Sequence, residues 1–375
     1  MIRVLHYGID SKLGGIETYL NKLYTNIDRD KFKFDFIYIG DEEPCYYNEF
    51  KDMGSNFYNI TPRSKNLIKH KRELRKLFKE NNFDIIHCHL NTLSYIEPII
   101  AAIENNIPVI VHSRNAGTSK SKVSNLLHKI NSYRIPKNKL TKLAVSDLAG
   151  DWLFGKDENY MVINNGLNIE KYKFDDNVRK RVRSEFGFKD ELVIIHLGAL
   201  REQKNHMFIL EIFKEVLKEE PKSKLLLVGD GHLKDSINSR INELNIENSV
   251  IMAGERNDVR DILCSGDIFL FPSFFEGFPN AVLEAQATGL PCFISDIITK
   301  EVMVNEDCYS ISLKKSAKEW AEQILIKRNN IKNRYNSSKE VKKKGFAVEE
   351  EIKRVSDIYI NLFNEQKKMR IKENE

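Results

Sequence analysis

Short apolar segments alternate with longer amphipathic segments along most of the 375-residue chain, and this alternation is the strongest constraint on its fold. Short runs rich in Ile, Val, Leu and Phe are typical of strands buried in a parallel sheet. Longer stretches with apolar residues three and four positions apart are typical of the covering helices. The segment His206–Glu219, with Ile209 and Phe213 on one face, is such a helix. The pattern predicts an α/β protein whose parallel sheets are covered on both faces.

The predicted strands fall into two series, which indicates two Rossmann-like domains. The first series comprises Ile2–Tyr7, Phe34–Ile39, Ile85–Cys88, Val109–Val111, Leu143–Val145 and Met161–Ile163. The second comprises Leu192–Leu197, Lys224–Val228, Ser249–Met252, Ile268–Phe271 and Cys292–Ser295. A polar stretch, 168–190, separates them and is expected to be the linker. The chain also exceeds the usual size of one hydrophobic core. We therefore expect domains over residues 1–168 and 169–347, followed by a helical segment, 348–375.

Composition indicates an ordinary globular protein, with 41% hydrophobic and 30% charged residues. No apolar run approaches the roughly 20 residues needed to cross a bilayer, and no signal-peptide pattern is evident, so a cytoplasmic location is expected. The five cysteines are odd in number and form no Cys-x-x-Cys pair, which predicts reduced core thiols. The net charge of +5, without interleaved arginine and aromatic residues, does not indicate a nucleic-acid partner.

Two glutamates flank the start of a helix predicted after the strand Ile268–Phe271. Glu276 lies in the connecting loop, and Pro279 has the fixed φ that favours a first helical turn. Glu284 lies inside the helix and leans back over the first turn, where free N–H groups attract a phosphate. Carboxylates accept hydrogen bonds from a ribose diol or a sugar hydroxyl. Gly277 allows close backbone approach, and the aromatic surroundings fit poorly with two merely solvated glutamates. The segment predicts a sugar-nucleotide site.

This segment resembles the Glu-x7-Glu element of the retaining glycosyltransferases of family 4. These enzymes have the GT-B fold, in which two Rossmann-like domains face each other across a cleft. The resemblance implies that Glu276 contacts the donor sugar and Glu284 the ribose, while backbone amides from Gly277 and Phe278 onward lie over the sugar and diphosphate. The resemblance covers nearly the whole chain. It also implies that the terminal helix packs back on the first domain, and that the donor is a nucleoside diphosphate sugar, with a UDP-sugar expected first.

The resemblance extends to loops at the carboxyl ends of other predicted strands, where ligands collect in open α/β sheets. Gly14, Gly15 and Glu17 match the Gly-Gly-x-Glu element of the family, and glycines that open a helix bring N–H groups to a phosphate or to the acceptor. His112 stands where a family histidine reaches the donor sugar. The segment 164–166, Asn-Asn-Gly, matches the turn that closes the first domain.

The second predicted domain departs from the family at the diphosphate site. The family pattern is Gly-Arg, four residues and Lys; Lys204 matches the lysine, whereas Ala199 occupies the arginine position. Either Arg201 takes its place, because a long guanidinium reaches phosphate from a neighbouring turn, or Lys204 and the helix dipole hold the charge. Gly229 is expected on the nucleotide side, and backbone groups of Arg256 are expected to read the base. The candidate catalytic residues are Glu276, His112 and Lys204.

Metal-independent chemistry is expected, with positive charge and helix N-termini stabilising the leaving diphosphate. A metal-dependent transferase needs an acidic pair after a strand, and the Asp-x-Asp at 28–30 instead follows a helix, where it fits a solvated turn. His87 and His89 share one face of a strand, but a metal site is rejected for want of a clear third ligand. No protein nucleophile is evident. The acceptor is therefore expected to attack on the face that the diphosphate leaves, with a phosphate oxygen taking its proton.

Partners and alternative functions follow from the remaining features. The stretch Arg63–Lys79 predicts an amphipathic helix with a basic face, which either rests on anionic lipid or is the solvated side of a helix packed on the sheet. The resemblance implies a glycan or lipid-linked glycan acceptor, as in capsule, exopolysaccharide or lipopolysaccharide assembly. Two alternatives stay open: a sugar-nucleotide epimerase of GT-B fold, and a sugar-nucleotide-binding protein with little turnover. A dehydrogenase is disfavoured because Lys234 replaces the third glycine of the dinucleotide fingerprint.

Overall fold

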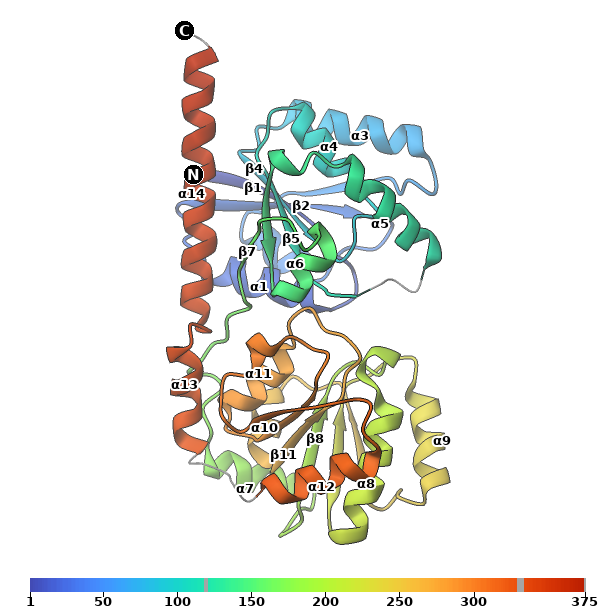
Figure 1. Ribbon diagram of the computed structural model, residues 1–375. Helices are drawn as coiled ribbons and strands as arrows, with labels where there is room; N and C mark the ends of the chain where they lie inside the picture. The colour runs from blue at the N-terminus through green and yellow to red at the C-terminus, as the bar shows by residue number, and fades with distance from the viewer. Residues whose placement is uncertain (118–120, 329–333, 374–375) are drawn as a thin grey trace. The chain divides into compact units, whose positions relative to one another are not determined.

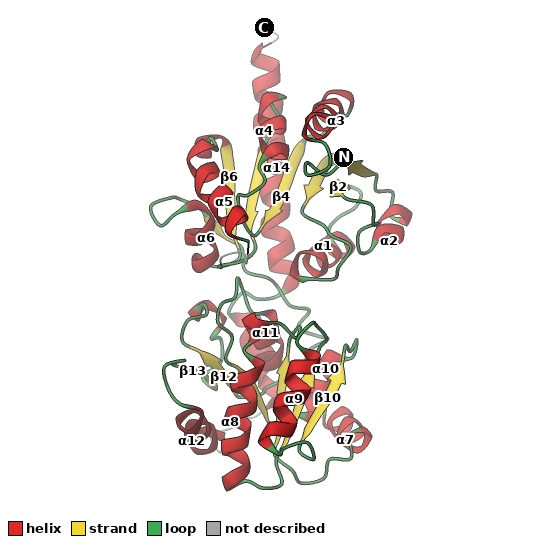
Figure 2. Cartoon of the chain, turned by 90° about the vertical axis from the view of Figure 1, so that its right-hand side faces the viewer, coloured by secondary structure: helices red, strands yellow, loops and turns green. Residues whose placement is uncertain are grey.

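The computed structural model describes residues 1–117, 121–328 and 334–373, which form two compact units. The first unit contains Met1–Asn165 and the segment from Glu349 onward, and the second contains Gly166–Val348. Each unit has one parallel sheet with helices on both faces (Figure 1, Figure 2). No helix within the described residues combines the length and the apolar character needed to cross a membrane. Residues 374–375 of the expected terminal helix lie outside the described residues.

The first unit has a seven-stranded parallel sheet in the order β3-β2-β1-β4-β5-β6-β7. Its strands are β1 (Ile2–Tyr7), β2 (Phe32–Ile39), β3 (Phe57–Ile60), β4 (Ile85–Leu90), β5 (Val109–Ser113), β6 (Leu140–Ala144) and β7 (Met161–Val162). Its helices are α1 (Gly15–Asn26), α2 (Tyr47–Asp52), α3 (Leu67–Glu80), α4 (Glu97–Glu104), α5 (Lys122–Arg134), α6 (Asp147–Phe154) and α14 (Val348–Glu373), the last joining it from the far end of the chain.

The second unit has a six-stranded parallel sheet in the order β10-β9-β8-β11-β12-β13. Its strands are β8 (Val193–Leu197), β9 (Lys224–Val228), β10 (Val250–Gly254), β11 (Ile268–Phe271), β12 (Cys292–Ser295) and β13 (Cys308–Ile311). Its helices are α7 (Asp176–Glu185), α8 (His206–Glu219), α9 (Lys234–Leu244), α10 (Val259–Ser265), α11 (Asn280–Ala287), α12 (Ala317–Lys327) and α13 (Ser337–Lys343).

Two apolar cores cover the faces of the first sheet. On one face, α3 and α4 bury residues such as Leu77 and Ile99 against β4 and β5. On the other face, α1 and α14 bury Tyr24 and Tyr359 against the phenylalanines of β2, including Phe34. Figure 1 shows α14 on the side of this sheet opposite α3 and α4. The terminal helix is therefore part of the first unit's core.

Three sequence predictions need correction. The edge strands β3 and β13 were missed, because each is short and carries exposed or half-exposed residues that do not form an apolar run. The stretch 168–190 is not a bare linker, since it contains α7, which packs against α10 inside the second unit.

The basic helix α3 is packed on the sheet, and the contact of its basic face with lipid stays a prediction. Its apolar residues Leu74, Leu77 and Phe78 are buried in the core of the first unit. Asn66 caps its first turn by accepting a hydrogen bond from the Lys69 N–H at 2.9 Å. Leu74, Leu77 and Phe78 are therefore not available to lipid, whereas Leu67 and Ile68 in the first turn are exposed.

We predict that Tyr359→Ala lowers the free energy of unfolding by about 3–5 kcal/mol, the usual cost of deleting a fully buried aromatic side chain. Ile371→Ala, in the exposed part of the same helix, is the matched control and should change stability by less than about 0.5 kcal/mol. Urea unfolding of both variants measures the difference. Equal stability of the two variants would show that α14 does not contribute to the core.

Candidate functional site

Both sheets contain one point at which the strand order reverses, between β1 and β4 in the first unit and between β8 and β11 in the second. Successive crossovers run in opposite directions from this point, so the loops after the two strands part at the carboxyl edge of the sheet. Ligands of open α/β sheets bind at this position. In the second unit, the loops that follow the two strands at this point are 198–205 and 272–279. They contain the predicted residues Lys204 and Glu276.

Lys204 and Glu276 form an ion pair at the reversal point of the second unit. The Lys204 Nζ donates to Glu276 Oε1 at 2.7 Å, and the two side chains are only 17% and 9% exposed. Three hydrogen bonds hold the two loops together: Phe274 N–H to the Gln203 carbonyl (2.9 Å), Gln203 Nε2 to the Phe275 carbonyl (2.8 Å) and Asn205 Nδ2 to the Pro272 carbonyl (3.1 Å). Salt screens such a sheltered pair much less than an exposed one. The structure therefore brings together two of the three predicted catalytic residues.

Glycines allow the close packing behind this ion pair. Gly229 has a φ of +135°, and a Cβ built on it would lie 2.2 Å from the Gly198 carbonyl oxygen. A Cβ on Gly198 would in turn lie 3.0 Å from Cε of Lys204. Gly229 therefore supports the loop that carries Lys204. Its predicted contact with a nucleotide stays a prediction.

Glu284 lies on α11, the helix that begins after the Glu276 loop, and is half-buried. Its neighbour is Tyr172, whose pKa is raised first by burial and then by the Glu284 carboxylate, to which it is hydrogen-bonded. A phenol that stays protonated donates its hydrogen bond, so Tyr172 orients the carboxylate. At the start of α11, Phe278 is buried and stacks on Phe346 with ring centroids 5.7 Å apart. Tyr172 was not predicted from sequence, because it lies far from Glu284 along the chain.

Arg201 and Arg256 have different surroundings from Lys204. The Arg201 side chain is exposed, so the structure does not bring it into the sheltered pair of Lys204 and Glu276. The Arg256 guanidinium forms ion pairs with Asp258 at 2.7 Å and with Glu185 at 2.9 Å, which ties its loop to α7. The role predicted for Arg256 concerned its backbone and stays a prediction.

In the first unit, Glu17 organises the loop that precedes α1. The Asp10 N–H donates to Glu17 Oε1 at 2.9 Å, and burial raises the pKa of this carboxyl group. Gly14 caps α1, and a Cβ on Gly14 would lie 2.9 Å from Glu17 Oε2. Gly14 thus leaves room for the buried carboxyl group, while Gly15 opens the helix. The Gly-Gly-x-Glu element thus forms the N-cap and first turn of α1, at the reversal point between β1 and β4.

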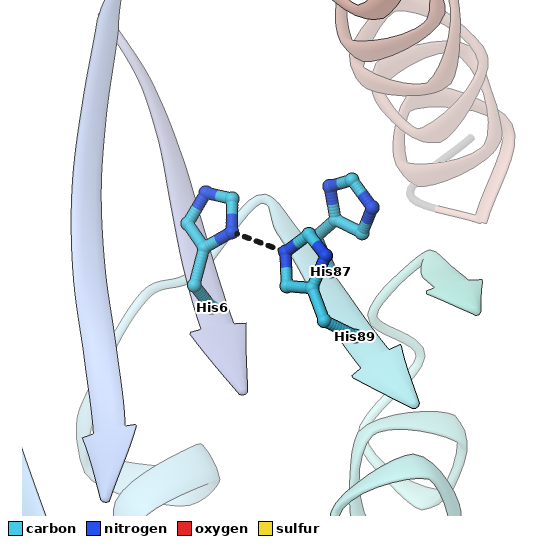
Figure 3. Close-up of side chains that lie close together, drawn as sticks. All are labelled: His6, His87 and His89. Carbon is cyan, nitrogen blue, oxygen red and sulfur yellow. Dashed lines mark hydrogen bonds between the residues drawn. The ribbon is translucent and has the colours of Figure 1, made fainter. Parts of the chain in front are cut away.

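Four buried histidines lie beside one another on the face of the first sheet that α1 and α14 cover. His6 and His87 are neighbours across β1 and β4, and His89 and His112 across β4 and β5. His6 Nδ1 and His89 Nε2 are 3.1 Å apart (Figure 3), and His87 Nε2 and His112 Nδ1 are 3.2 Å apart. Burial lowers the pKa of each, to about 3 for His6, so all four imidazoles are neutral near pH 7.

The direction of these hydrogen bonds follows from Arg114. A guanidinium only donates, so His112 Nε2, 3.3 Å from Arg114 Nη1, is the acceptor. Neutral His112 then carries its proton on Nδ1 and donates to His87. His87 in turn donates from Nδ1 to the Tyr359 hydroxyl at 2.7 Å. In this structure His112 is fully buried with both ring nitrogens engaged. Its predicted contact with the donor sugar stays a prediction.

Arg114 itself was not predicted as a site residue. Its Nη2 donates to Asn165 Oδ1 at 2.9 Å, and its guanidinium lies 3.8 Å from the centre of the Tyr19 ring. His112, Asn165 and Tyr19 are all uncharged contacts. The sequence signal was weak, because Arg114 is a single cation after a strand, and its contacts Asn165 and Tyr19 come from distant segments.

The reason for rejecting a metal at His87 and His89 was wrong, because His6 supplies a third imidazole. The three side chains offer nitrogens within 4.8 Å of one another. However, His87 uses both nitrogens for Tyr359 and His112, and His6 and His89 are hydrogen-bonded to each other. In the described part of the chain, this leaves His6 Nε2 and His89 Nδ1 without partners. Two nitrogens are fewer than the three or four protein ligands of a zinc site, so we interpret the cluster as a hydrogen-bond network.

Solved structures with the same arrangement define the fold class. A crystal structure of Anabaena Alr3699/HepE in complex with UDP-glucose matches with a TM-score of 0.79 at 16% identity, covering 96% of this chain and 100% of that one. Sucrose-phosphate synthase from Thermosynechococcus elongatus matches with a TM-score of 0.74 at 15% identity, covering 97% and 100%. The protein has the GT-B fold, as predicted.

Sequence comparison identifies the family. Residues 13–171 match the model described as Glycosyltransferase Family 4, and residues 191–327 match Glycosyl transferases group 1. The chain is 29% identical to the putative glycosyltransferase EpsF of Bacillus subtilis, over 86% of each chain. It is 25% identical to the capsular polysaccharide biosynthesis glycosyltransferase CapH of Staphylococcus aureus, over 86% of this chain and 90% of that one. The two matched domains and the relatives show a glycosyltransferase of the group 1 and family 4 type, which confirms the prediction.

The buried histidines make stability dependent on pH. Histidines titrate near pH 6.5 in an unfolded chain, whereas burial lowers the pKa of His6, His87, His89, His112, His196 and His206 in the folded protein. The unfolded state therefore binds protons first as the pH falls. We predict that the free energy of unfolding decreases below about pH 6.5, by at most about 1.4 kcal/mol per pH unit for each histidine.

Urea unfolding at pH 7.5 and 5.5 measures this effect, with a lower midpoint expected at pH 5.5. His232→Gln is the control, because His232 is exposed and should leave the difference between the two midpoints unchanged. A midpoint that does not move between these pH values would contradict the neutral, buried network.

Proposed function

We propose that this glycosyltransferase moves a sugar, with retention of configuration, from a UDP-sugar to a hydroxyl group of a lipid-linked glycan. The observation that carries the proposal is the sheltered ion pair of Lys204 and Glu276 at the reversal point of the second sheet, with Glu284 on the helix that begins there. HepE, which shares the fold, binds UDP-glucose. An Escherichia coli relative, 24% identical over 96% of this chain and 97% of that one, is a UDP-Gal:alpha-D-GlcNAc-diphosphoundecaprenol alpha-1,3-galactosyltransferase.

The donor's diphosphate and sugar are assigned to the two partners of the ion pair. Without a donor, the Lys204 ammonium neutralises Glu276. A bound diphosphate competes for the ammonium, which frees the Glu276 oxygens to accept hydrogen bonds from sugar hydroxyls. The N–H groups of Gly277 and Phe278, before α11, supply further donors to the phosphates. Lys204 takes the main cationic role because Ala199 has no charge and Arg201 is exposed.

Glu284 is assigned to the ribose. Tyr172 holds this carboxylate by a hydrogen bond, which leaves acceptor capacity for the two hydroxyls of a ribose diol. The base is then expected beyond Glu284. The Arg256 backbone was predicted to read the base, and Gly229 was predicted to lie on the nucleotide side.

The transfer step needs no protein nucleophile. The bond between the anomeric carbon and the diphosphate oxygen breaks, and the acceptor hydroxyl oxygen bonds to the same carbon from the face that the diphosphate leaves. The acceptor proton passes to a phosphate oxygen, so charge balances without a metal ion. Lys204 and the N–H groups stabilise the leaving diphosphate, which is where negative charge develops. Glu276 orients the sugar in our proposal. A contact of the sugar with His112 stays a prediction, because both ring nitrogens of this buried histidine are hydrogen-bonded in the structure.

The acceptor is assigned to the first unit. The Gly14–Glu17 element presents N–H groups at the reversal point of that sheet, and Arg114 is a cation with uncharged contacts on the neighbouring strand. Both features suit an acceptor that carries phosphate. EpsF and CapH, the latter named for capsular polysaccharide biosynthesis, support a role in surface polysaccharide assembly. We infer that the enzyme works in the cytoplasm, at the membrane surface that carries the acceptor.

We predict that Glu284→Ala weakens UDP binding by about 10- to 100-fold, because a hydrogen bond to a charged group contributes about 1.5–3 kcal/mol. A thermal-shift titration measures this, since ligand at one hundred times its dissociation constant stabilises a protein by about 2.7 kcal/mol. Glu247→Ala, an exposed position in the same unit, is the control and should bind like wild type. Unchanged UDP binding by Glu284→Ala would overturn the ribose assignment.

We predict that Glu276→Gln lowers turnover by on the order of 100-fold while UDP affinity changes little, because Glu276 contacts the sugar rather than the nucleotide. Turnover is measured with UDP-glucose, UDP-galactose and their N-acetylamino counterparts on a polyprenyl-diphosphate glycan. Equal losses of turnover and UDP affinity would contradict the assignment. Reactions without acceptor test the alternatives: a changed sugar nucleotide would indicate an epimerase, and nucleotide binding without any product would indicate a binding protein.

A further inference from the structure

Helix α5 exposes a continuous stripe of large apolar side chains. Val123, Leu126, Ile130 and Tyr133 are 66%, 59%, 43% and 83% exposed. Their spacing of three, four and three residues places them on one face of the helix. Single exposed apolar residues need no explanation, but a connected apolar patch marks an interaction surface.

The inner side of α5 is held to the first unit mainly by polar contacts. The one buried residue of the helix is Asn131, whose Nδ2 donates to the Leu93 carbonyl at 2.7 Å. His128 accepts a hydrogen bond from the Leu93 N–H at 3.0 Å and stacks on Trp152 with ring centroids 4.7 Å apart. This inverts the usual arrangement, in which a helix buries its apolar face and exposes its polar one. The contacts of Asn131 and His128 fix α5 with its apolar stripe outward.

The charge on α5 restricts what covers the stripe. The helix contains Lys122, Lys129 and Arg134, all exposed, and no acidic residue. The next turn adds the exposed Lys139, whereas Lys137 is ion-paired with Glu158. An apolar stripe bordered by cations, with a tyrosine at its end, has the composition of a helix that lies in the surface of an anionic bilayer. An acidic, apolar protein partner would fit the charge as well, but a membrane also fits the straight, one-helix shape of the stripe.

We propose that α5 docks the first unit on anionic phospholipid, with Val123, Leu126, Ile130 and Tyr133 in the boundary between headgroups and acyl chains. Lys122, Lys129 and Arg134 then lie at the level of the lipid phosphates. This inference deepens the proposed function, because a lipid-linked acceptor is met at that surface. The docking itself requires only the first unit. It assigns the membrane contact to α5 rather than to α3, which buries Leu74, Leu77 and Phe78 in the core.

The test is flotation of the full chain with vesicles of phosphatidylglycerol and phosphatidylcholine, compared with vesicles of phosphatidylcholine alone. Wild type is expected to bind the anionic vesicles, and less so at high salt. The double substitution Leu126→Gln with Ile130→Gln should weaken this binding at least tenfold. Lys122→Gln with Lys129→Gln should weaken it roughly 25-fold at low salt, since each basic residue near an anionic surface contributes about fivefold.

Matched controls separate α5 from other exposed apolar residues. Ile326→Gln, on α12 of the second unit, and Ile68→Gln, on α3, remove side chains that are more exposed than Leu126 and Ile130, and they should leave vesicle binding unchanged. The proposal is overturned if wild type does not bind anionic vesicles, or if the α5 double substitution binds as tightly as wild type. Loss of binding on Ile68→Gln alone would place the contact on α3 and would also overturn it.

Two further measurements keep the docking distinct from the transfer reaction. The α5 double substitution should keep the wild-type thermal shift with UDP, which shows that it folds and binds nucleotide. Sedimentation of wild type without vesicles should give a monomer; a dimer that dissociates on the α5 substitution would make the stripe a contact between two copies and overturn the proposal. Vesicle binding without transfer from any UDP-sugar would instead refute the proposed function and leave the docking intact.

Discussion

The reversal of strand order between β8 and β11 is the constraint on which the candidate site depends. Crossovers between parallel strands are right-handed, so the helices after these two strands cover opposite faces of the sheet and their loops part at its carboxyl edge. Lys204 precedes one helix and Glu276 the other, and their ion pair joins the two loops. Glycines at 198 and 229 permit this approach, because a side chain at 229 would clash with the Gly198 carbonyl and one at 198 would crowd the Lys204 side chain. The donor assignments to Lys204, Glu276 and Glu284 all rely on this local geometry.

The first unit rests on a different interaction, the buried hydrogen-bond network of its histidines. Buried polar groups are costly unless they are paired, so each imidazole in the chain from Arg114 to Tyr359 is held in one tautomer. Tyr359 comes from α14, at the far end of the sequence. The terminal helix thus completes both the apolar core and the polar network of the unit that contains the N-terminus. Arg114, after β5, is thus connected through His112 and His87 to the hydroxyl group of Tyr359.

Helices α3 and α5 show how packing decides what an amphipathic pattern means. The sequence of α3 has the stronger basic and apolar periodicity, yet Leu74, Leu77 and Phe78 face the core. The pattern of α5 is weaker, because its inner face is held by Asn131 and His128 rather than by a row of leucines. Its apolar residues are consequently the exposed ones. The membrane surface that we propose therefore lies on the helix that periodicity did not single out.

The sequence by itself determined the strands that are buried on both faces, including β1, β9, β11 and β12 with the predicted ends. It also determined the GT-B class and the places of Glu276 in the loop before α11 and of Glu284 within that helix. These features are local, because burial on both faces produces an apolar run and helix entry produces a motif. Only the tertiary structure decided the edge strands β3 and β13, the place of His6 beside His87 and His89, and the contacts of Glu284 with Tyr172 and of Arg114 with Asn165. These two edge strands are partly exposed and lack an apolar run. The contacts join segments that strand order and crossovers bring together, and no local pattern encodes that proximity.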